Sequence, residues 1–185
     1  MKIKLFAIGL LALLMVSIAG PSFTGRASAA VRTVPVASAP AAHNQAFFDR
    51  TRFLFDMGIA FFAIHHVYKK YQQGYYASGT SGRTKHIIAA GVVLLIAVNR
   101  LNAAYKRANE SNSKTLHALA SPINALLGKA KGTYGTFNGK NGNVDPSTVD
   151  SSLQGLNSQS SQLGSQANGA GYNIKDISTP LPAGA

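Results

Sequence analysis

Two apolar stretches, 53-FLFDMGIAFFAIHHVY-68 and 87-IIAAGVVLLIAV-98, decide the fold of this chain, because they are rich enough in Phe, Ile, Leu and Val to require burial. Each stretch favours a helix. Between them lies a polar segment, 72–82, in which Gly74, Gly79 and Gly82 interrupt the apolar pattern. The sequence therefore predicts an antiparallel helical hairpin over 47–105.

The first residues predict export. Lys2 and Lys4 precede an apolar run, 5–20, and Ala27-Ser28-Ala29 supplies small residues for a signal peptidase. This order of charged, apolar and small residues is typical of a secretory signal peptide, which we assign to 1–29; the alternative is an uncleaved anchor helix. An extended linker over 30–46, containing Pro35 and Pro40, is expected to follow.

The predicted hairpin suits a membrane. Tyrosines and lysines cluster where its first arm ends, as is typical of a membrane interface: Tyr68, Lys69, Lys70, Tyr71, Tyr75 and Tyr76. The alternative is a helix end packed on a soluble core. The second apolar run of 12 residues is short for the ~20 residues of a spanning helix, so the buried span would have to extend to Tyr105.

Charge pairs support an antiparallel register. If the loop is centred near Ser78, Asp56 faces Arg100 and Asp49 faces Arg107. Both acids then share one face of the first arm, and both arginines share one face of the second. The same register brings small residues of the two arms together, which allows close helix packing in lipid: Ala60, Ala63, Ala89, Ala90, Gly91 and Ala97.

The remaining segments predict amphipathic helices and loose connections. A basic amphipathic helix is expected over 106–131, kinked at Pro122, and a turn-rich loop over 132–145. A weak helix is expected over 146–168, with Asp145 as N-cap and an apolar stripe that must pair with itself or with the upstream helix. A flexible tail should occupy 169–185. The predicted fold is thus mainly α: a two-helix antiparallel membrane hairpin, amphipathic helices and a Gly/Ser/Asn/Gln-rich tail.

Composition narrows the function. The chain has 185 residues, a formal net charge of +12 and no Cys, so anionic partners are favoured and thiolate metal sites are excluded. We find no zinc helix, phosphate-binding loop or nucleophile elbow, and we expect no enzyme, no cofactor and no metal. His65, His66 and His86 could hold haem across the hairpin, but interfacial histidines are the favoured interpretation.

These features favour a non-enzymatic accessory or scaffold protein, exported and held in the membrane by its hairpin, with its C-terminal region extracytoplasmic. Its expected partners are anionic lipid and a protein, or a second copy, that contacts its helices. Nucleic acid is not expected, since the cations are scattered without an aromatic stacking platform. The alternative is a secreted soluble basic module that binds anionic wall polymer or nucleic acid.

Overall fold

The protein folds into helices, which a computed structural model describes for residues 41–138 and 144–181. The predicted signal peptide, 1–29, and most of the predicted linker lie outside these residues. Four long helices and one short helix make up the described part: α1 (Ala41–Gln72), α2 (Arg83–Glu110), α3 (Lys114–Ala118), α4 (Ala120–Asn138) and α5 (Pro146–Gly169). The prediction of a mainly helical fold is confirmed.

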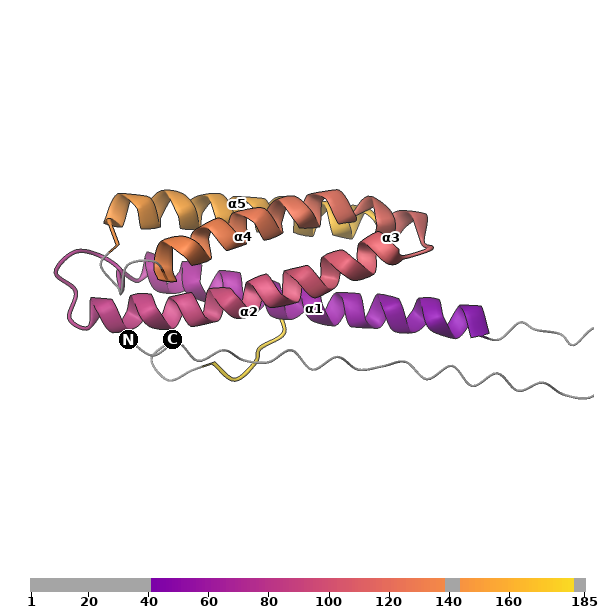
Figure 1. Cartoon of the computed structure of the whole chain (residues 1–185), viewed down its shortest axis with the longest axis horizontal. Coiled ribbons are helices and arrows are strands. Elements are labelled where there is room, and N and C mark those ends of the chain that lie inside the picture. The colour runs from indigo at the N-terminus through magenta and orange to yellow at the C-terminus, as the bar shows by residue number, and fades with distance from the viewer. Residues whose placement is uncertain (1–40, 139–143, 182–185) are drawn as a thin grey trace, which may run out of the picture. The chain divides into compact units, whose positions relative to one another are not determined.

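The long helices form an up-down-up-down four-helix bundle. α1 packs on α2, α2 on α4, α4 on α5 and α5 on α1, and successive long helices run in opposite directions (Figure 1). Each helix therefore covers part of the apolar face of two neighbours, which is the packing of a four-helix bundle around a shared core. The core includes large side chains from every long helix, such as Phe53, Leu94, Leu126 and Leu153.

The hairpin of α1 and α2 has the predicted loop, since α1 ends at Gln72 and α2 begins at Arg83. Gly74, Gly79 and Gly82 all adopt positive φ, a conformation that glycine tolerates without steric cost. The inner faces of this hairpin pack against α4 and α5 as well as against each other. Helices of the same chain thus bury much of the apolar surface that the sequence analysis assigned to lipid.

The amphipathic helix predicted over 106–131 is interrupted. α2 continues to Glu110, and Ser113 then caps α3 by accepting a hydrogen bond from the backbone N–H of Leu116 at 3.4 Å. Pro122 does not kink a helix, because it lies in the first turn of α4, where a missing N–H leaves no hydrogen bond unmade.

α4 extends through most of the segment predicted as a loop over 132–145, up to Asn138. Thr133 and Phe137 are buried in the bundle. Their burial outweighs the low helix propensity of Gly132 and Gly135. α1 begins at Ala41, five residues before the predicted linker was expected to end.

α5 matches the expected helix closely. The Asp145 side chain accepts hydrogen bonds from the Ser147 N–H at 2.8 Å and the Ser147 hydroxyl at 2.7 Å, and Pro146 occupies the first turn. The six residues of its predicted stripe are all buried: Val149, Leu153, Leu156, Ser160, Leu163 and Ala167. The stripe packs on α4 and α1, so the upstream helices provide the partner that the stripe required.

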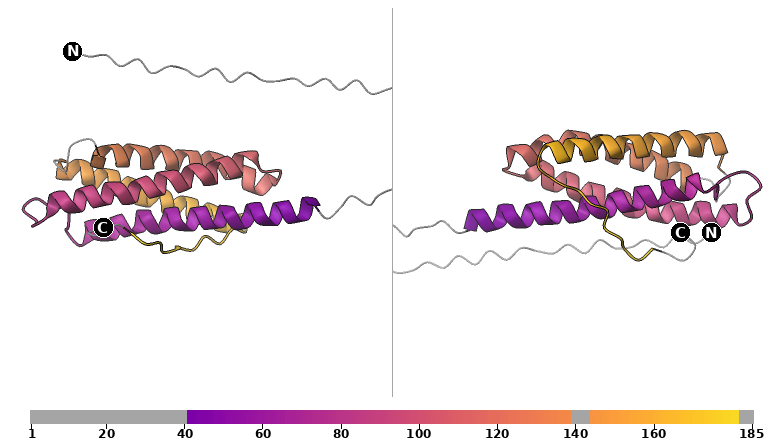
Figure 2. Two further views of the ribbon diagram at one scale, coloured as in Figure 1. Left: turned by 60° about the horizontal axis from the view of Figure 1, so that its bottom comes forward. Right: turned by 180° about the vertical axis from the view of Figure 1, so that it is seen from behind.

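The segment after α5 lies against α1, although the sequence predicted a flexible tail over 169–185. Figure 2 shows residues 171–181, which we call the strap, crossing α1. Ile177 donates its backbone N–H to the carbonyl oxygen of Gly58 at 3.0 Å, and Arg50 donates to the carbonyl oxygen of Gly171 at 2.8 Å. Gly58 permits this approach because it has no side chain.

Candidate functional site

Asp56 is the buried charge of the hairpin. It is 3% exposed, and its two carboxylate oxygens accept hydrogen bonds from Arg100 Nη1 at 3.1 Å and from Arg107 Nε at 3.0 Å. The Asp56–Arg100 contact is the one that the register argument predicts. The side chains of Arg100 and Arg107 are 44% and 32% exposed, so the buried carboxylate is paired with two guanidinium groups that still contact solvent.

The predicted pairing of Asp49 with Arg107 is wrong, because Arg107 contacts Asp56 instead. Helical side chains lean towards the N-terminus of their own helix. Since α1 and α2 are antiparallel, this lean moves Arg107 back towards the level of Asp56 and moves Asp49 away from Arg107. One buried carboxylate therefore receives both arginines, an arrangement suited to fixing the register of the hairpin.

The tyrosine and lysine cluster predicted at a membrane interface contacts the bundle. The Tyr71 hydroxyl donates to the Asp150 carboxylate on α5, and this hydrogen bond raises the pKa of Tyr71. Tyr76 packs edge-on against Phe137 of α4, with ring centroids 5.6 Å apart, and burial raises its pKa. These two residues tie the loop end of the hairpin to α4 and α5.

The other members of the cluster lie closer to solvent. Lys70 Nζ lies 4.5 Å from the centroid of the Tyr75 ring, a cation–π contact. Tyr68 is half-buried beside Tyr71, with ring centroids 5.8 Å apart, while Lys69 is exposed. Some members of the tyrosine and lysine cluster therefore pack against α4 and α5, and others remain at the protein surface.

The three hairpin histidines have separate neighbours. His65 Nδ1 lies 2.8 Å from Asp176 Oδ2 of the strap, and the His86 ring packs edge-on against Tyr75 with centroids 4.7 Å apart. His66 lies beside Phe62. Within residues 41–138 and 144–181, no group of three or more His, Asp or Glu side chains is placed to hold a metal ion.

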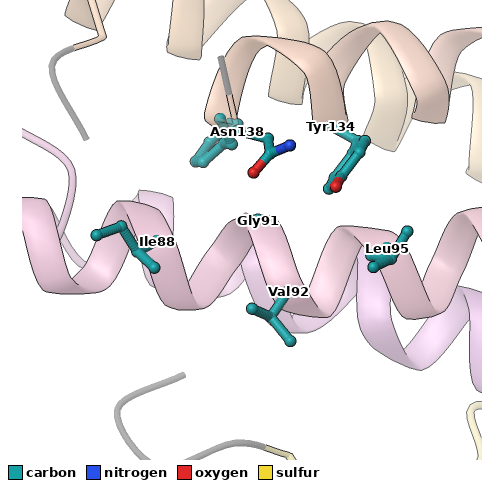
Figure 3. Close-up of a pocket in the computed structure, with 7 residues that line it drawn as sticks. Ile88, Gly91, Val92, Leu95, Tyr134 and Asn138 are labelled. Atoms are coloured by element: carbon teal, nitrogen blue, oxygen red, sulfur yellow. The ribbon is translucent and has the colours of Figure 1, made fainter. Parts of the chain in front are cut away.

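A groove lies between α2 and α4 and is lined partly by aliphatic side chains (Figure 3). Its volume is about 190 Å³, and Ile88, Val92 and Leu95 supply its α2 side. Tyr134 and Asn138 point from α4 towards α2, opposite Gly91. Gly91 was expected to face α1, but an added Cβ there would lie 3.7 Å from Cβ of Phe137, so this glycine allows close approach of α4 instead.

Ile88, Val92 and Leu95, which we call the α2 ridge, were not singled out by the sequence analysis, although their spacing carries a signal. They recur at intervals of four and three residues and are 52%, 44% and 38% exposed. Other apolar residues of the same helix, Ile87, Leu94 and Val98, are buried in the core. A helix with apolar residues on nearly all sides has more apolar surface than one core can cover. The run 87–98 has this property, so the sequence indicated that part of α2 would stay exposed.

α2 is also the one helix of the described residues that is long and apolar enough to cross a membrane, judged by length and composition. Its most apolar window is 56% buried inside the bundle. Comparison with protein-family models, curated proteins and solved structures finds no match for this chain. The interpretation of its function therefore depends on its own geometry.

Proposed function

We propose that this chain is an exported, non-enzymatic accessory or scaffold protein that works at a membrane surface as a folded four-helix bundle. The observation that carries the proposal is the α2 ridge, an exposed aliphatic surface on a helix whose other faces are packed in the core. Isolated apolar side chains are normal on protein surfaces, whereas a contiguous apolar face typically marks an interaction site.

The packing of α4 and α5 favours a surface position over a spanning hairpin. If α1 and α2 crossed the bilayer with this bundle intact, the outer face of α5 would enter lipid, and that face presents Ser151, Gln154, Ser158 and Gln162. Polar side chains without partners are costly in hydrocarbon. A hairpin that spans would have to leave α4 and α5, which pack on its inner faces in the bundle.

Export remains part of the proposal on the strength of the N-terminal sequence, which has a charged start, an apolar middle and a small-residue end. The scaffold role follows from the motifs that the sequence lacks and from the presence of a surface suited to binding. In this proposal the bundle core and the two Asp56 ion pairs hold the helices together, and the α2 ridge makes the contacts with the membrane.

Cell fractionation tests the proposal. The protein should pellet with membranes at low ionic strength and leave them in alkaline carbonate, because a peripheral bundle has no segment that spans the bilayer. Retention after carbonate would support the spanning hairpin instead. Recovery only in the soluble fraction at low ionic strength would favour the second candidate, described next.

The second candidate is a secreted soluble module that binds an anionic polymer. It is favoured by the charge distribution, since α5 carries no Lys or Arg, whereas α1 carries four, α2 carries five and α4 carries two. The basic residues of the long helices therefore lie on α1, α2 and α4. Binding of the soluble protein to an acidic wall polymer, with no association to membranes, is the result that would select this candidate.

A further inference from the structure

Exposed lysines share the side of the bundle on which the α2 ridge lies. Lys85 precedes Ile88 by three residues, and Lys106 follows Leu95 by eleven, so both lie on the ridge side of α2. Lys131 precedes Tyr134 by three residues on α4, across the groove. All three lysines are exposed. The groove and its surroundings thus combine aliphatic surface with positive charge.

Most carboxylates lie elsewhere, although Asp145 follows Val144, whose carbonyl oxygen accepts a hydrogen bond from Arg83 at the start of α2. α4 has no Asp or Glu, and the one carboxylate of α2 is Glu110 at its last residue. Asp150 lies on α5 and Asp176 on the strap, where each contacts α1. An anionic surface that approached the α2 ridge would therefore meet mainly cations.

This charge pattern selects between the possible occupants of the ridge. A second copy of the chain would bring the same exposed lysines towards this face, and repulsion between like charges opposes association. An anionic bilayer surface supplies the opposite charge, and its acyl region accepts Ile88, Val92 and Leu95. Lysine side chains at such a boundary extend their amines to the headgroups, and tyrosine is favoured there.

We propose that the α2 ridge, together with Lys85, Lys106 and Lys131, is a docking surface for anionic lipid, with the aliphatic side chains entering the headgroup–acyl boundary and the lysines contacting phosphate. This inference rests on the proposed function of the protein at a membrane. It specifies that the α2 ridge is the face that meets the lipid, and that the lipid must be anionic. The depth expected for such an interfacial helix is only ~5–10 Å, so no segment has to leave the bundle.

Flotation with lipid vesicles tests the docking surface. The protein, purified as cells produce it and with its N-terminus sequenced, is mixed with vesicles of phosphatidylcholine alone or of phosphatidylcholine with phosphatidylglycerol. Ile88→Ser with Val92→Ser should weaken binding to the anionic vesicles roughly tenfold, because two exposed aliphatic side chains no longer leave water. Lys85→Glu with Lys131→Glu should weaken it by roughly tenfold or more, and added salt should weaken binding of the unaltered chain.

Phe48→Ser is the matched control. Phe48 is 60% exposed on α1, away from the groove residues, so its replacement removes comparable apolar surface outside the docking surface. It should leave vesicle binding within twofold, and thermal unfolding should show that all variants remain folded. Equal loss with the control, unchanged binding of the ridge variants, or equal binding to neutral vesicles would overturn the inference.

Two further outcomes separate this inference from the proposed function. If the ridge variants still pellet with cell membranes, the protein works at a membrane but uses another surface, and the inference fails alone. If the unaltered protein dimerises in solution and the ridge variants do not, the ridge is a self-association surface. If the unaltered protein never pellets with membranes in cells, the proposed function fails, whatever the vesicles show.

Discussion

The carboxylate of Asp56 lies 3.1 Å from Arg100, inside a hairpin whose other facing residues are apolar or small. A buried carboxylate is stable there only while it is hydrogen-bonded. A shift of α1 against α2 would remove its partners. The pair therefore favours one register among several that the apolar side chains alone could accept.

A double-mutant cycle checks this role. Asp56→Ala should lower the free energy of unfolding by about 1–3 kcal/mol, less than for a fully buried pair, because both arginines are partly solvated. Arg100→Ala should cost less than Asp56→Ala, since Arg107 still contacts the carboxylate. The coupling between Asp56 and Arg100 should be about 0.5–2 kcal/mol in chemical denaturation.

Asp49→Ala is the control for that cycle. Asp49 is half-exposed, and Arg107, the partner expected from the sequence, contacts Asp56 instead. Its replacement should change the free energy of unfolding by at most ~0.5 kcal/mol. Coupling of Asp49 with Arg107 that equalled the coupling of Asp56 with Arg100 would contradict the observed pairing.

Gly58→Ala should displace the strap. An added Cβ would lie 2.5 Å from the carbonyl oxygen of Lys175 and 2.7 Å from the Ile177 side chain. Overpacking of this kind costs about 1–3 kcal/mol, from which the higher helix propensity of alanine subtracts part. Hydrogen exchange should show faster exchange of the Ile177 amide, while the amides of α2 keep their protection. An unchanged Ile177 amide would show that the strap does not depend on this contact.

Gly128→Ala and Gly132→Ala should each stabilise the protein. Both glycines lie inside α4, and nothing lies within 4 Å of a Cβ added at either position. Alanine restricts the unfolded chain and suits a helix better, so each change should add about 0.5–1 kcal/mol to the free energy of unfolding. A loss of stability for Gly132→Ala would contradict the helix that the structure shows in place of the predicted loop, and a loss for Gly128→Ala would contradict the open surroundings of that glycine in α4.

Tyr76→Phe should reduce the sensitivity of the fold to alkali. Burial raises the pKa of Tyr76 above its ordinary value of 10.0. Above pH 10 the unfolded chain therefore loses this proton while the folded chain keeps it, and the free energy of unfolding falls as the pH rises. The variant should match the unaltered protein near neutral pH and show a shallower decline above pH 10 in urea titrations. Parallel declines would mean that Tyr76 is accessible in the folded state.

Much of the fold follows from local pattern. Asp145-Pro146 and the stripe from Val149 to Ala167 predicted α5 because caps and heptad spacing are local signals. The three loop glycines predicted the turn between α1 and α2. Asp56 and Arg100 could be paired because an antiparallel hairpin with a short loop has few possible registers.

The remainder depends on contacts between distant segments. An apolar run such as Phe53–Tyr68 can be buried by lipid or by other helices, and its composition does not distinguish the two. α4 continues through Gly132 and Gly135 because Phe137 packs beside Gly91 and Tyr76. The strap is held partly by backbone carbonyl oxygens of Gly58 and Gly171, and Gly58 and its neighbours are distant in sequence from the strap, so no local pattern indicated the contact.

The central claim is that the folded bundle lies at the membrane surface without spanning it. Labelling experiments that locate the loop between α1 and α2 on one side of the membrane or the other test this claim most directly. The chain has no Cys, so Ser78→Cys in the loop and Ser158→Cys on the exposed face of α5 each give a single site for a membrane-impermeant maleimide. A folded bundle at the surface predicts that intact cells, or spheroplasts, label both positions equally. Labelling of Ser158→Cys alone, with Ser78→Cys reacting only after lysis, would place the loop across the membrane and contradict the account.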